Sequence, residues 1–176
     1  IFALYIPFQK MPDILRNVFG ERQNMTDPYR NVTTLFMNAI LKNEPVYIYG
    51  DGEQKRNFTY VQDIIPYMYQ AGFQEGISGM TFNIGSSETY TLNEFWRAIK
   101  QITGTTIEPI YLPERMNEVK EAIAETSHSR IVLGEYGTTP IMQALKRTWR
   151  YVKEMGPQEL KYTELELPEA KGIPKN

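Results

Sequence analysis

The residues best suited to chemistry lie in the run from Val46 to Asp63, where one arginine follows a tight turn. The apolar, β-prone residues 46–49 end at Gly50-Asp51-Gly52, a tripeptide typical of turns. Arg56 comes next, and its planar guanidinium presents paired donors that suit a phosphate group. Judged on these residues alone, a surface hairpin with a solvated arginine is the better interpretation, and phosphate binding is the alternative.

The segments around this turn alternate between short strands and amphipathic helices. Apolar spacing and the capping box at Thr91-Leu92-Asn93-Glu94 predict helices over 32–42, 61–73, 92–102, 127–133 and 140–155. Short β-prone runs predict strands over 46–49, 80–84 and 106–112. Pro66 is placed in the first turn of its helix, where proline is tolerated. This order predicts an α/β fold with a small mixed sheet, typical of a substrate-binding lobe rather than a doubly wound sheet.

Composition narrows the classes of function. The chain has 176 residues, 41% of them hydrophobic, and a net charge of -2 with no block of like charges, which argues against a general nucleic-acid binder. No cysteine is present, which excludes disulfides and thiolate metal sites and fits a cytoplasmic protein. The single histidine, His128, excludes a multi-histidine metal site, so we expect no metal. No apolar run reaches the length of a membrane span, so no membrane contact is expected.

Five segments resemble, in the same order, motifs of the extended short-chain dehydrogenase/reductases that act on nucleotide sugars. The resemblance is to the NAD-dependent epimerase/dehydratase family, and it covers most of the chain. The segments and the motifs they resemble are 17–24 (NVYGPRQ), 46–63 (IYGDGxQxRDFxYVxD), 82–88 (FNIGSGE), 112–118 (RPGE) and 125–134 (ADTSKARxxLG). Five matches in order indicate the family and not one member of it.

The resemblance implies that three charged residues contact the nucleotide diphosphate. Arg56 aligns with an arginine that contacts phosphate, and Arg115 with a second arginine for phosphate or ribose. Glu118 aligns with the acid that accepts ribose hydroxyls. The alternative for Arg56 is a surface ion pair with Asp51 or Asp63. Met116-Asn117 replaces the Pro-Gly of the family motif, which changes the path of this loop.

Four further residues are implied to contact the ligand. Asn17 aligns with an asparagine that hydrogen-bonds the substrate; the alternative is a turn residue. Tyr47 and Tyr49 align with the segment that lines the base pocket, where the alternative is strand packing. Asn83 aligns with an asparagine near the nucleotide, and capping of the following turn is an equally good interpretation.

Two parts that the resemblance requires are not found in the sequence. There is no glycine-rich strand–turn–helix fingerprint for a dinucleotide. There is also no Tyr-x-x-x-Lys pair, because Tyr5 and Lys10 are five apart with Pro7 between them. We therefore expect no catalytic residue in this chain, and NAD only in the full-length enzyme.

We predict three segments: 1–16, unassigned and a candidate remnant of the Rossmann half; 17–155, a nucleotide-sugar-binding lobe; and 156–176, an extended tail. The chain lacks a starting Met, and we expect it to be part of a longer protein with most of its Rossmann domain elsewhere. The predicted function is the substrate-binding portion of an NAD-dependent nucleotide-sugar epimerase or dehydratase, an isomerase or lyase of carbohydrate metabolism. The partners would be a nucleotide-diphosphate sugar and a second copy in a homodimer. The alternatives are a stand-alone nucleotide-sugar-binding module and a degenerate lobe for protein contacts, and the retained Arg56 and Arg115 argue against the last.

Overall fold

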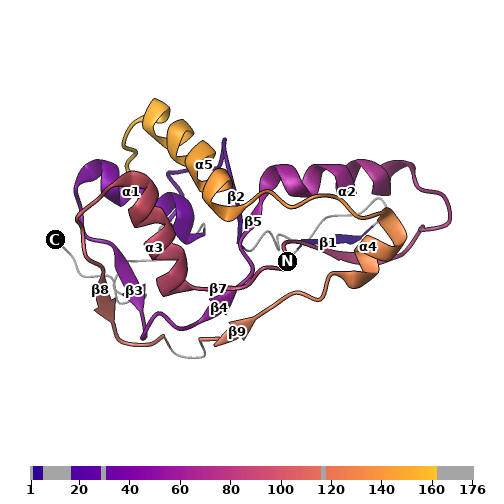
Figure 1. The fold of residues 1–176 in the computed structure, drawn as a ribbon, viewed down its shortest axis with the longest axis horizontal. Coiled ribbons are helices and arrows are strands. Elements are labelled where there is room, and N and C mark those ends of the chain that lie inside the picture. Colours follow the sequence, from indigo (N-terminus) through magenta and orange to yellow (C-terminus); the bar gives the residue numbers. More distant parts are fainter. Residues whose placement is uncertain (1, 6–16, 29–30, 116–117, 162–176) are drawn as a thin grey trace.

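Two hydrophobic clusters lie toward the two ends of an elongated molecule (Figure 1). The structure is a computed structural model that describes residues 2–5, 17–28, 31–115 and 118–161. Its helices are α1 (Val32–Lys42), α2 (Val61–Phe73), α3 (Leu92–Thr103), α4 (Ser127–Leu133) and α5 (Ile141–Met155). Its strands are β1 (Phe2–Tyr5), β2 (Val18–Phe19), β3 (Tyr47–Tyr49), β4 (Lys55–Arg56), β5 (Thr59–Tyr60), β6 (Thr81–Ile84), β7 (Tyr90–Thr91), β8 (Ile110–Leu112) and β9 (Glu121–Ala122).

The larger lobe packs α1, α3 and α5 around the first cluster. The ring of Phe95 on α3 stacks on Phe58 at 3.6 Å between centroids, and Trp96 meets Phe36 of α1 edge to face at 5.5 Å. The predicted capping box is present, since Thr91 Oγ1 accepts from the Glu94 amide and the Glu94 carboxylate accepts from the Thr91 amide. These local signals start α3 with the face that carries Phe95 and Trp96 turned to the core.

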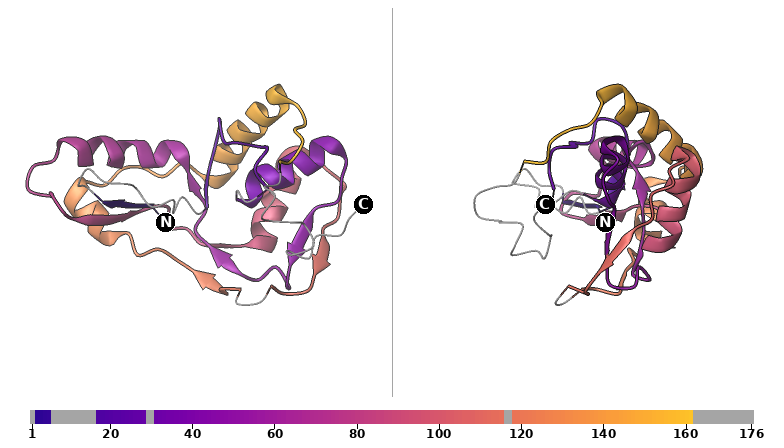
Figure 2. Two further views of the ribbon diagram at one scale, coloured as in Figure 1. Left: turned by 180° about the vertical axis from the view of Figure 1, so that it is seen from behind. Right: turned by 90° about the vertical axis from the view of Figure 1, so that its left-hand side faces the viewer.

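The smaller lobe lays α2 and α4 against the antiparallel pair β1–β6 (Figure 2). Phe82 and Ile84 of β6 are buried with Tyr67 of α2 and Leu133 of α4 in the second cluster. The prediction that Pro66 lies in the first turn is wrong, because α2 begins at Val61 and the proline lies inside the helix.

The remaining strands form short ladders. β2 and β5 pair in parallel, β3 and β8 pair in parallel, and β4 lies between β7 and β9. These small mixed sheets confirm the predicted fold class. The strand predicted over 106–112 is shorter than expected, since only Ile110–Leu112 pair with a neighbour.

The chain beyond α5 is extended and lies against α1. The side chain of Asn38, 3% exposed, donates to the Gln158 carbonyl and accepts from the Gln158 amide, both at 2.8 Å. Lys161 N–H donates to the Thr26 carbonyl at 2.7 Å. Residues 157–161 are therefore fixed by hydrogen bonds, and residues 162–176 of the predicted tail lie outside the described residues.

Candidate ligand-binding site

The turn before Arg56 is fixed by two glycines and by the start of α3. Gly50 and Gly52 have φ angles of 72° and 77°, in the left-handed region that favours glycine. A Cβ on Gly52 would lie 2.2 Å from Asn93 Oδ1, so no other residue fits there without movement. The Asp51 carboxylate accepts from the Glu53 amide at 3.0 Å and closes the turn. The sequence thus fixes where β4 and its arginine begin.

Arg56 is held by its own sheet. Its Nη1 donates to the carbonyls of Lys55 (2.8 Å) and Lys120 (3.3 Å), and its Nη2 donates to Glu118 Oε1 (2.8 Å). The side chains of this ion pair are only 16% and 22% exposed, so the solvated hairpin is excluded for this arginine. The acidic partner is neither Asp51 nor Asp63 but Glu118, which was itself a predicted site residue.

Arg115 lies in the loop after β8 and contacts Tyr49 of β3. Its guanidinium carbon lies 3.7 Å from the ring centroid of Tyr49, a cation–π contact. Tyr49 pairs in register with Leu112 across the parallel β3–β8 ladder, which brings the residues after β8 over the ring. The Glu118 amide donates to the Arg115 carbonyl at 3.1 Å and so links the two charged residues. Residues 116–117 of this loop lie outside the described residues.

The structure therefore brings together four of the seven predicted site residues: Tyr49, Arg56, Arg115 and Glu118. We call these four residues the arginine cluster. Tyr47 lies two residues before Tyr49 on β3, on the same face of the strand and half-buried. Ile48 between them is fully buried, which is plain strand packing.

Asn17 and Asn83 lie apart from the arginine cluster, around β5. The Asn17 carbonyl accepts from the Thr59 amide at 3.0 Å, and its φ of 67° makes it a left-handed turn residue. The Asn83 carbonyl accepts from Ser129 Oγ at 2.7 Å, while its side chain is exposed on β6. The ligand roles of both asparagines, like those of the other five residues, stay predictions.

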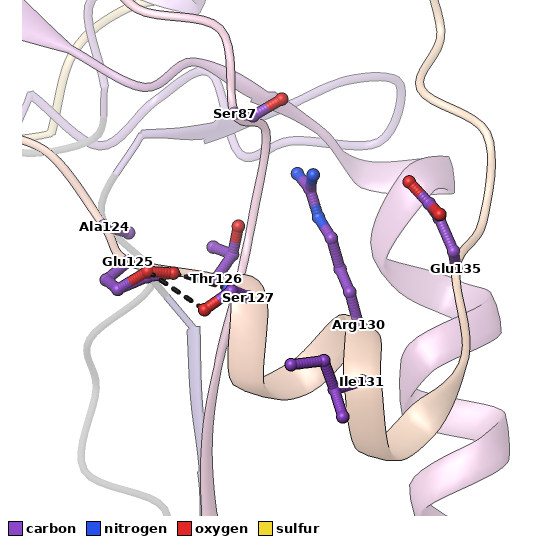
Figure 3. Close-up of a pocket in the computed structure, with 8 residues that line it drawn as sticks. All are labelled: Ser87, Ala124, Glu125, Thr126, Ser127, Arg130, Ile131 and Glu135. Atoms are coloured by element: carbon purple, nitrogen blue, oxygen red, sulfur yellow. Dashed lines mark hydrogen bonds between the residues drawn. The ribbon is translucent and has the colours of Figure 1, made fainter.

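A concave region lies beside α4, and none of the predicted site residues lines it. This open pocket of about 510 Å³ is lined by Ser87, Ala124, Glu125, Thr126, Ser127, Arg130, Ile131 and Glu135. Figure 3 shows the Arg130 side chain rising from α4 toward Ser87, with Glu135 beside it. The Ser127 amide and hydroxyl both donate to the Glu125 carboxylate (2.6 and 3.2 Å), which holds the pKa of Glu125 below its ordinary value.

From the sequence, this pocket segment is predicted only as the start of the helix over 127–133. The sequence carries no signal that Ser87 comes close to Arg130, because the approach depends on the path of two loops. Within the described ranges no group of three or more His, Cys, Asp or Glu side chains could hold a metal ion. No helix of that part of the chain is both long and apolar enough to cross a membrane.

Comparison with known proteins gives the same family as the motifs. Residues 13–85 match the model of the NAD dependent epimerase/dehydratase family. The UDP-glucose 4-epimerase of Mycolicibacterium smegmatis is 27% identical over 139 residues, which cover 78% of this chain and 43% of the relative. The UDP-glucuronic acid decarboxylase 1 of Xenopus tropicalis is 28% identical over 138 residues, which cover 78% of this chain and 32% of the relative.

A solved structure shows the same fold with ligands bound. UDP-glucuronic acid 4-epimerase from Bacillus cereus, in complex with UDP-glucuronic acid and NAD, superposes with a TM-score of 0.72 at 26% identity. The match covers 79% of this chain and 43% of that one. The chain therefore spans less than half the length of these relatives.

Proposed function

Because this chain belongs to the NAD-dependent epimerase/dehydratase family, we propose that residues 17–155 bind the nucleotide diphosphate of a UDP-sugar. The observation that carries the proposal is the arginine cluster, in which two arginines and one carboxylate are held together by described contacts. The relatives named above act on UDP-linked sugars, and the epimerase complex holds such a ligand.

The cluster suits a diphosphate for electrostatic reasons. Arg56 donates from Nη1 to two carbonyls and from Nη2 to Glu118, and these bonds fix the plane of the guanidinium. Among the described hydrogen bonds, none is made by the Nε of Arg56. Arg115 lies on the Tyr49 ring, which supports the cation without neutralising it. Two fixed cations match the two phosphates of a nucleoside diphosphate, because planar guanidinium groups bind phosphate oxygens in pairs.

Glu118 has a second role in this proposal. Its carboxylate pairs with Arg56 in the free protein and offsets the charge of that arginine, while its backbone amide bonds to the Arg115 carbonyl. A bound diphosphate takes over that pairing, and the carboxylate oxygens then accept from ribose hydroxyls. In this exchange Arg56 keeps an anionic partner and the Glu118 carboxylate keeps hydrogen-bond donors in both states, which limits the cost of desolvation.

In the whole enzyme we propose that this lobe orients the sugar and performs no bond-breaking step. NAD would supply the redox chemistry there, and the sugar would pass through a 4-keto intermediate. The sequence holds no glycine-rich strand–turn–helix segment, and we assign NAD to no residue of this chain. Fixing the diphosphate at a distance from the reacting carbon contributes orientation, which lowers the barrier through proximity.

Calorimetric titration with UDP, UDP-glucose and uridine tests the proposal. We expect UDP and UDP-glucose to bind and uridine to bind far more weakly, because the cluster recognises phosphate. Arg56→Ala is expected to weaken UDP binding by about tenfold or more, since a charge-assisted hydrogen bond contributes about 1.5–3 kcal/mol.

Arg97→Ala on the exposed face of α3 is the matched control and should leave the affinity unchanged. Equal affinities for UDP and uridine, or no UDP binding by the unaltered chain, would refute the proposed function.

A further inference from the structure

We infer that Asn57 is a positioning residue that clamps the strand of Arg56 to both neighbouring segments and so holds the arginine in its binding geometry. The inference rests on the proposed function. Asn57 directly follows Arg56 and is 3% exposed, and the hydrogen bonds described for its side chain go to residues outside the arginine cluster.

The Asn57 amide bonds to two different segments. Its Oδ1 accepts from the Ala124 amide at 2.8 Å, on the segment that follows β9. Its Nδ2 donates to the Glu88 carbonyl at 3.0 Å and to Thr89 Oγ1 at 3.2 Å, on the segment that precedes β7. One side chain thus joins both flanks of β4.

These bonds extend the sheet at the point where its backbone pairing ends. In the order β7-β4-β9, Arg56 pairs with Tyr90 on one side and Ala122 on the other, and these are the last pairs of both ladders. At the next residue the Asn57 side chain takes the place of the backbone and bonds to both neighbours. A two-residue strand is marginal by itself, so a clamp at its end matters for its register.

The clamp reaches Arg56 through Lys120. The Lys120 carbonyl accepts from the Lys55 amide at 2.8 Å and from Arg56 Nη1 at 3.3 Å. The segment 120–124 is therefore held against β4 by Lys120, by the ladder pairs of Glu121 and Ala122, and beyond the last pair by the bond from Ala124 to Asn57. Without that last bond the end of β9 can fray from β4, which loosens the strand pairing that holds the Lys120 carbonyl on the guanidinium of Arg56.

The Asn57 amide meets two demands at once. The site offers a backbone N–H, which needs an acceptor, and a carbonyl, which needs a donor, on opposite flanks of the same strand. Asparagine supplies both from one planar group. Alanine supplies neither and leaves the buried Ala124 amide without its partner, which costs more than the lost bond alone.

The test uses the chain as it stands, with UDP as the probe, and compares Asn57→Ala with Asn38→Ala. Asn38 is the matched control, because it is equally buried at 3% and also bonds to backbone groups through both ends of its amide, but on α1. N57A is expected to weaken UDP binding about tenfold and N38A less than about twofold. In an R56A background, N57A should weaken UDP binding further by less than about twofold, because Asn57 acts through the arginine.

Amide hydrogen exchange gives a second measurement that needs no ligand. N57A should speed exchange at residues 120–124 by about tenfold or more, whereas N38A should not. Unchanged exchange at 120–124 overturns the inference, whether or not UDP binds. The inference is also overturned if N57A weakens UDP binding by the same factor in the unaltered protein and in the R56A variant. Clear acceleration at 120–124 with no UDP binding by the unaltered chain supports the clamp and refutes the proposed function instead.

Discussion

Tyr60 is a buried residue whose pKa gives the protein a measurable pH dependence of stability. Its ring is 2% exposed between the lobes, and its hydroxyl donates to both oxygens of the Glu21 carboxylate at 2.9 and 2.7 Å. Burial raises the pKa of Tyr60 above its ordinary value, and the hydrogen bond to Glu21 adds to the rise. Nearby Arg147 acts in the opposite direction with a smaller effect.

The sign of the resulting pH dependence follows from linkage. A raised pKa in the folded state means that the protonated tyrosine stabilises the fold, fully so below the unfolded pKa of about 10. That contribution is lost as the pH rises through the folded pKa. We therefore expect the unfolding free energy of the unaltered protein to fall more steeply above about pH 10 than that of Tyr60→Phe. Urea unfolding at a series of alkaline pH values measures both slopes.

Glu21→Gln separates the two causes. Burial is the larger one, so this variant should keep most of the steep alkaline slope although the charge of the acceptor is gone. A slope for Glu21→Gln that matches Tyr60→Phe would show that the carboxylate, and not burial, sets the pKa.

At the scale of elements, α3 depends on its first turn. Thr91 and Glu94 satisfy two amides that would otherwise lack partners, and Gly104 ends the helix with a φ of 69°. We expect Thr91→Ala to lower the unfolding free energy by about 1 kcal/mol, the usual cost of losing an N-cap. Chemical denaturation measures this loss. Thr106 is an exposed threonine in the loop after α3, and Thr106→Ala is the control that should leave the unfolding free energy nearly unchanged.

Elements with local signals were predictable from the sequence. α1 and α2 have the predicted bounds, and the capping box gave the start of α3, because spacing and caps act within one turn. The partner of Arg56 was not predictable. Glu118 lies 62 residues away, and the pairing depends on β9 joining β4 in parallel, which no local pattern encodes. Asn57 was overlooked for the same reason, since its bonds reach residues 31 and 67 positions away.

At the scale of the whole molecule, the two hydrophobic clusters are distinct. The first holds α1, α3 and α5 together, and the second holds β6, α2 and α4 (Figure 1). The lobes meet at β5, which leads directly into α2, and through Asp63, whose carboxylate accepts from the Thr139 amide and hydroxyl at 3.0 and 2.6 Å. The arginine cluster belongs to the larger lobe, so its geometry does not depend on the packing of the second cluster.

This division predicts that the lobes open independently. Phe82→Ala empties the centre of the second cluster, where the side chain is fully buried, and such truncations cost about 3–5 kcal/mol. We expect hydrogen exchange to speed up in α2 and α4 while α3 and α5 keep their protection, because separate clusters act as separate cooperative units. Phe95→Ala, equally buried in the first cluster, should do the reverse and should also weaken UDP binding. Equal acceleration in both lobes by either variant would show instead that the described residues unfold as one unit.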